Sequence, residues 1–88
     1  MKQNPNFLLQ EVADSIVLVP VGEAVGKFPG MVTLNETGKI LWDALCTDQT
    51  AESLVATLLE QFEVDAAQAR QDVDAFLYKL TAVGAVTD

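Results

Sequence analysis

Met31-Val32-Thr33-Leu34-Asn35-Glu36-Thr37-Gly38 is the stretch that decides the fold, because within it the sequence changes from a strand pattern to a helix pattern. Residues 31–34 predict a short strand that can lie at the edge of a sheet. Asn35 is a favoured helix N-cap, and Glu36 suits the positive end of the helix dipole. We therefore expect strands before Asn35 and helices after it.

The segment before Asn35 predicts two further strands joined as a hairpin. Residues 7–12 form a run of strand length, and residues 16–19 are a β-branched run that ends at Pro20. Between them, Ala13-Asp14-Ser15 suits a tight turn. Residues 22–30 contain three glycines and one proline, which indicates a loop. Residues 1–6 are expected to be a polar tail outside the domain.

The segment after Asn35 predicts three amphipathic helices. Thr50 can cap the second helix, Asp65 with Gln68 resembles a capping box at the start of the third, and Gly84 suits its end. Apolar residues recur at helical spacing in all three, at Ile40, Leu41, Trp42, Ala44 and Leu45, then Leu54, Val55, Leu58, Leu59 and Phe62, then Ala66, Ala69, Val73, Phe76, Leu77 and Leu80. We expect one α+β domain over residues 7–88, a three-stranded antiparallel sheet followed by three helices.

Composition excludes several classes of function. The chain has 88 residues, no His, one Cys, and Lys+Arg 5 against Asp+Glu 13, for a net charge of −8. These counts exclude an internal disulfide, a zinc site of Cys and His, and histidine-based catalysis. So few basic residues argue against nucleic-acid binding. With neither a signal peptide nor a membrane-length apolar run, and with an unpaired cysteine, we expect a cytoplasmic protein.

Individual residues give little support for an active site. Cys46 is expected to be a small, buried, inert residue near a helix end. Asp72 and Asp74 are two apart on a helix and face different directions, so they do not predict a metal site. The glycines of the loop are spaced too widely for a phosphate loop, and Trp42 is expected in the core. We expect no enzyme activity, no metal and no cofactor.

The order of elements also fits a winged helix-turn-helix, a fold that commonly binds DNA. Its third helix should then carry basic and amide groups. Here Arg70 and Lys79 are balanced by Asp72 and Asp74. We therefore expect a winged-helix-like fold without the DNA function.

Two stretches resemble the PqqD family. One runs from Phe28 through Leu34-Asn35-Glu36-Thr37-Gly38 to Ile40-Leu41-Trp42, and the other is Val17-Leu18-Val19-Pro20-Val21-Gly22. The last third of the chain is similar too, so the resemblance covers about residues 7–86. Members typically carry a basic residue near position 10 and Gly near position 14, where this chain has Gln10 and Asp14.

The resemblance implies a RiPP recognition element, a truncated winged-helix domain that is not itself a catalyst. Such domains hold the leader segment of a ribosomally made precursor peptide and present it to a modifying enzyme, often a radical S-adenosylmethionine enzyme. The leader adds a strand to the sheet in the groove between the third strand and the third helix. Backbone pairing at a strand edge needs no titratable side chain.

The expected peptide-binding residues lie on the strand and on one flank of the third helix. Around Val73, one flank holds Phe76, Leu80 and Val83 and should face the first two helices. The other flank is left for the groove. The expected set is therefore Met31, Val32, Thr33, Leu34, Arg70, Asp74, Leu77, Tyr78 and Thr81.

Other interpretations stay open at this point. The helix residues could be ordinary surface, and the acidic charge could either favour a basic partner or only confer solubility. The domain could be a transcriptional or adaptor winged helix, or a structural subunit that binds only its partner enzyme. A free third-strand edge could also pair two copies into a homodimer.

Overall fold

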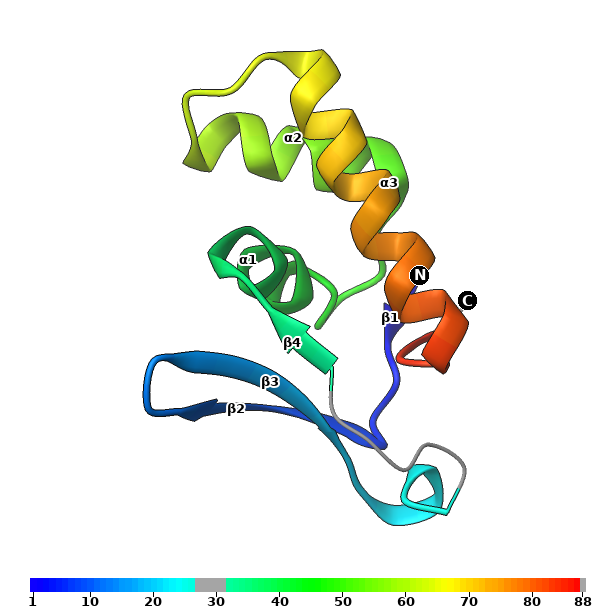
Figure 1. Ribbon diagram of the computed structural model, residues 1–88. Helices are drawn as coiled ribbons and strands as arrows, with labels where there is room; N and C mark the ends of the chain where they lie inside the picture. Colours follow the sequence, from blue (N-terminus) through cyan, green and yellow to red (C-terminus); the bar gives the residue numbers. More distant parts are fainter. Residues whose placement is uncertain (27–31, 88) are drawn as a thin grey trace.

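The computed structural model describes residues 1–26 and 32–87 (Figure 1). The elements follow in the order β1 (Lys2–Gln3), β2 (Phe7–Val12), β3 (Ser15–Pro20), a short 3₁₀ helix η1 (Gly22–Ala24), β4 (Val32–Leu34), α1 (Glu36–Ala44), α2 (Ala51–Gln61), α3 (Ala66–Val83) and β5 (Val86–Thr87). The predicted three strands and three helices are all present, and the α+β fold class is confirmed.

The main sheet is antiparallel with the order β2-β3-β4. Phe7 pairs with Pro20 at one end of the hairpin, and Ala13 takes a positive φ of 55° in its turn. Leu34 of β4 pairs with Ile16 of β3. Within this sheet β3 is therefore the central strand, and β4 is an edge strand, as the sequence predicts.

One face of the sheet carries the apolar side chains that meet the helices. Leu18, Val32 and Leu34 point into the core, whereas Leu8 and Val12 on the other face are 49% and 61% exposed. Figure 1 shows the three helices on one side of the hairpin. The alternation along β4 and the first part of β2 thus places the helices on the buried face, while β3 buries both Val17 and Leu18.

The three predicted N-caps fix where the helices begin. The Asn35 side chain accepts a hydrogen bond from the Gly38 N–H, and Asp65 does the same for Gln68. Thr50 and Ser53 form a reciprocal capping box. Seven fully buried side chains fill the space between helices and sheet, namely Leu18, Leu41, Leu45, Leu54, Leu58, Val73 and Leu80. Trp42 is 3% exposed, so its predicted place in the core is confirmed.

A second, two-stranded sheet differs from the sequence expectation for residues 1–6. Strand β1 pairs antiparallel with β5, so this polar segment is joined to the domain. Gln3 donates its backbone N–H to the Leu45 carbonyl over 2.9 Å and its side-chain amide to the Trp42 carbonyl over 2.7 Å. A strand of two residues is too short to show apolar alternation, and this one is held by backbone and side-chain amide hydrogen bonds. The sequence pattern therefore does not predict the β1–β5 sheet.

None of the helices in the described part of the chain has the length and hydropathy needed to cross a membrane.

Gly84 ends α3 in the left-handed region, with φ 77°. A side chain there would meet no atom within 4 Å, so only backbone strain opposes it. We expect Gly84→Ala to lower the free energy of unfolding by about 1–2 kcal/mol, measured by urea denaturation. Gly26→Ala is the matched control, because Gly26 has neither a positive φ nor a neighbour within 4 Å. An equal effect of the two changes would contradict the assignment to backbone strain.

Candidate functional site

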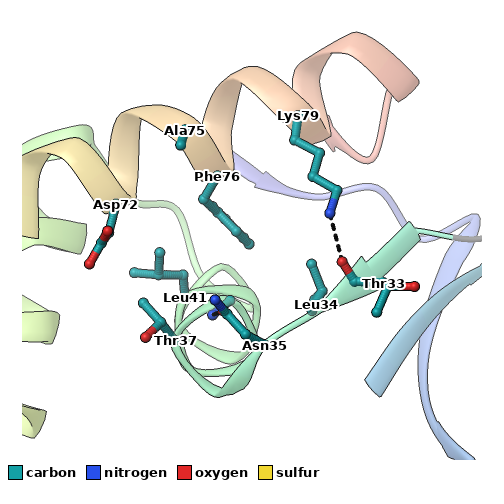
Figure 2. A pocket seen from close by; sticks show the side chains of 10 residues that line it. Thr33, Leu34, Asn35, Thr37, Leu41, Asp72, Ala75, Phe76 and Lys79 are labelled. Carbon is teal, nitrogen blue, oxygen red and sulfur yellow. Dashed lines mark hydrogen bonds between the residues drawn. The ribbon is translucent and has the colours of Figure 1, made fainter. Parts of the chain in front are cut away.

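A groove of about 530 Å³ lies between β4, the start of α1 and α3 (Figure 2). This volume falls in the range of about 300–1,000 Å³ that is usual for binding sites. Its lining residues come from the strand (Thr33, Leu34), from the turn into α1 (Asn35, Thr37, Gly38, Leu41) and from α3 (Asp72, Ala75, Phe76, Lys79). We call it the β4–α3 groove.

The strand side of the groove is the edge of β4. The Lys79 ammonium donates a hydrogen bond to the Thr33 carbonyl over 2.7 Å, so this carbonyl points toward α3. In a strand, the N–H and C=O of one residue point to the same side. The Thr33 N–H therefore also faces the groove, and the Thr33 side chain is exposed. This edge offers a donor and an acceptor to an extended peptide.

The floor of the groove is apolar because helix α1 packs close beneath it. Leu34, Leu41 and Phe76 are all buried and lie together in Figure 2. Gly38 permits this approach, since a Cβ there would lie only 3.3 Å from the Leu34 Cβ. An apolar floor beside a polar strand edge suits a peptide that pairs through its backbone and buries alternate side chains.

The helix wall carries opposite charges at its two ends. Lys79 lies over Thr33, and Asp72 lies on the side of Thr37 (Figure 2). The Asp72 carboxylate accepts a hydrogen bond from the Gln68 side-chain amide over 2.9 Å. Ala75 lies between these charged residues in the sequence and is exposed. The wall is thus open at its centre and charged at its ends.

The strand residues expected at the site differ in whether they line the groove. Thr33 and Leu34 line the groove, and Val32 is buried in the core beneath the same strand. Met31 falls outside the described residues. The structure therefore places the expected strand at the groove, with Thr33 as its exposed side chain.

The flank of α3 that was expected at the site lies at a different hollow from the β4–α3 groove. Asp74, Leu77, Tyr78 and Thr81 line a separate, more open depression, and they do not line the β4–α3 groove. Their role as peptide contacts stays a prediction. The reasoning from sequence assumed that the more apolar flank would face only helices. The floor of the groove is itself built on α1, so the flank of Phe76 faces helix and groove together.

Arg70, the remaining expected residue, is engaged on the surface. Its Nε lies 3.1 Å from a carboxylate oxygen of Asp74, and its Nη1 lies 3.7 Å from one of Glu52. The α3 residues that line the groove without belonging to the expected set are Asp72, Ala75, Phe76 and Lys79. They lie at i, i+3, i+4 and i+7, which is a single helix face. That spacing is the sequence signal from which these residues could have been grouped on one face of the helix.

The other chemically reactive groups do not gather into a site among the described residues. Cys46 is exposed, where burial was expected, because Leu45 beside it points into the core. Residues 1–26 and 32–87 hold no cluster of three or more possible metal ligands. The pKa of Lys39 is raised by its hydrogen bond and charge interaction with Glu11. The pKa of Asp48 is lowered by the Met1 ammonium. These residues belong to surface ion pairs outside the groove.

Comparison with known proteins relates the chain to one family and two solved structures. Residues 15–86 match the family model described as coenzyme PQQ synthesis protein D (PqqD). The fold resembles TbiB1 in complex with the TbiA(beta) leader peptide, with a TM-score of 0.75 at 20% identity over 100% of both chains. It also resembles lasso peptide synthetase B1 complexed with the leader peptide, with a TM-score of 0.74 at 18% identity over 99% of this chain and 96% of that one. No curated protein matches the sequence significantly.

Proposed function

The chain belongs to the PqqD family, and from that premise we propose that it is a non-catalytic peptide chaperone. It binds the leader segment of a ribosomally made precursor peptide in the β4–α3 groove and presents it to a modifying enzyme. The leader adds an antiparallel strand to the edge of β4. The precursor peptide is the primary partner, with no requirement for a metal, a cofactor, nucleic acid or a membrane.

The observation that carries this proposal is the edge of β4 above an apolar floor. Thr33 presents backbone groups toward α3, and Leu34 and Phe76 supply buried apolar surface beneath them. An added strand would satisfy the backbone groups and place alternate side chains on the floor. The two similar structures are complexes with leader peptides, which supports the same type of occupant here.

For the modifying enzyme, we propose a class of enzyme and no individual protein. We infer a radical S-adenosylmethionine enzyme in the cytoplasm as the partner class, from the resemblance to PqqD. The acidic chain favours a basic surface on that enzyme or on the peptide, through charge complementarity. Copurification from the native cell, with and without the precursor peptide, tests this partner. Binding of an enzyme without any peptide would favour a structural subunit instead.

The proposal is tested by titrating the protein with the leader peptide encoded beside its gene. We expect micromolar or tighter binding, on the order of −8 kcal/mol. In NMR spectra, the amides of Val32–Leu34 and of the α3 residues at the groove should shift. Shifts confined to α2 and residues 22–26 would place binding elsewhere. Sequence-selective DNA binding in a low-salt mobility shift would favour a winged-helix adaptor.

Thr33→Pro is expected to weaken leader binding about tenfold, because proline removes the N–H that faces the groove. An edge strand tolerates proline where its N–H does not pair with the neighbouring strand, so the fold should persist. Isothermal titration calorimetry measures the change, after circular dichroism has verified the fold. Thr33→Val is the matched control, because it keeps the N–H and alters only an exposed side chain. Equal affinities of both variants would contradict pairing at Thr33.

A further inference from the structure

The β4–α3 groove contains two charged residues among those that line it, Asp72 and Lys79. They are seven residues apart on α3, which corresponds to about 10.5 Å along the helix axis. Each residue makes its hydrogen bond elsewhere, since the Lys79 ammonium donates to the Thr33 carbonyl and the Asp72 carboxylate accepts from the Gln68 side-chain amide. The groove therefore has a cationic end and an anionic end.

The Lys79 ammonium is hydrogen-bonded to the Thr33 carbonyl oxygen, which an added strand needs as an acceptor. A peptide that pairs with β4 would donate an N–H to the Thr33 carbonyl and displace the ammonium from it. The displaced ammonium is stabilised when it gains another acceptor nearby, and a carboxylate gives the strongest hydrogen bond. An acidic peptide side chain at this end would supply that acceptor.

The direction of the peptide determines which charge it meets first. Purely antiparallel or purely parallel sheets are favoured over mixed sheets. A strand added to this antiparallel sheet is therefore expected to run antiparallel to β4. Strand β4 runs from the Lys79 end toward α1 and the Asp72 end (Figure 2). An antiparallel peptide therefore passes Asp72 first and Lys79 second. At about 3.4 Å per residue, the separation of the two positions along α3 corresponds to about three residues. Peptide side chains that share one face are an even number of residues apart, so the two that face α3 are two or four residues apart.

We propose that Asp72 and Lys79 select leader peptides by the order of their charges. The favoured peptide carries a basic side chain that faces Asp72 and, two or four residues later, an acidic side chain that faces Lys79. This inference rests on the proposed function and adds a specificity to it. Displacement of Lys79 from Thr33 is part of the recognition, because the carboxylate replaces the lost acceptor.

The test is selection from a display library of short random peptides on three forms of the protein. These are the wild type, the double variant Asp72→Lys/Lys79→Glu, and the double variant Glu11→Lys/Lys39→Glu. Both double variants keep the net charge of the chain. The second is the matched control, because it exchanges a surface ion pair outside the groove. Circular dichroism verifies each fold.

We expect basic-before-acidic peptides on the wild type and on the control, and the opposite order on the Asp72→Lys/Lys79→Glu variant. A selected peptide should bind the wild type at least about tenfold more tightly than its charge-exchanged counterpart, because the exchange removes both charge-assisted contacts. The inference is overturned if the order is random, is unchanged by the exchange, or is acidic-before-basic on the wild type. If no selected peptide protects the β4 amides from hydrogen exchange, the result contradicts the proposed function itself.

Discussion

Replacing Ala75 with arginine is expected to reduce the affinity for the leader peptide about a hundredfold. Ala75 is exposed at the middle of the groove wall, where a strand beside β4 would pass. An arginine there can pair with Asp72 one turn earlier, which holds its side chain across the opening. Several backbone hydrogen bonds would be lost together, at about 0.5–1.5 kcal/mol each. Isothermal titration calorimetry with the leader peptide measures the loss.

Ala82→Arg is the matched control for this change. Ala82 is also an exposed alanine of α3, and it lines the separate depression with Leu77, Tyr78 and Thr81. Both variants add one positive charge to the same helix, so nonspecific electrostatic effects are equal. We expect Ala82→Arg to bind like the wild type. The reverse pattern would assign the peptide to the flank that sequence reasoning chose.

Trp42→Ala is expected to cause the largest loss of stability. Trp42 is 3% exposed within the core of α1, and removal of a buried tryptophan costs about 3–5 kcal/mol. That is a large part of the roughly 5–15 kcal/mol that stabilises a small domain. Urea denaturation followed by far-ultraviolet circular dichroism measures the change, because the substitution removes the single tryptophan of the chain.

Tyr78→Ala is the aromatic control for this measurement. Tyr78 is 81% exposed on α3, so its removal should change the free energy of unfolding by no more than about 0.5 kcal/mol. Similar losses in the two variants would contradict the placement of Trp42 in the core. The Tyr78 variant also tests whether that side chain contacts the leader peptide.

Most of the fold could be predicted because local signals and burial agree. The caps Asn35, Thr50 and Asp65 begin the helices, and the alternation of Leu18, Val32 and Leu34 matches the sheet register. The β1–β5 sheet could not be predicted. Two-residue strands carry no periodicity, and their stability comes from contacts between distant segments such as Gln3 and Leu45.

The strand side of the β4–α3 groove carries residues expected from the sequence, whereas its α3 side carries residues outside the expected set. An edge strand follows from strand order, which the sequence pattern predicts well. The rotation of α3 depends on how Phe76 packs over Leu41 and Leu34, and that is a property of the assembled core. Composition along one helix cannot reveal what the neighbouring elements present to it. Lys79 is recognised as a groove residue only once its contact with the Thr33 carbonyl is known, and the sequence does not predict that contact.

The contact of Lys79 with Thr33 also bears on self-association. If two copies paired through their β4 edges about a twofold axis, both ammonium groups would meet near the shared Thr33 positions, and like charges would repel. Lysine at an exposed strand edge is a recognised obstacle to pairing between copies. A leader peptide with a carboxylate at that position meets attraction instead. We therefore expect the same side chain to oppose pairing between copies at this edge and, if the proposed function holds, to leave the edge available to a peptide.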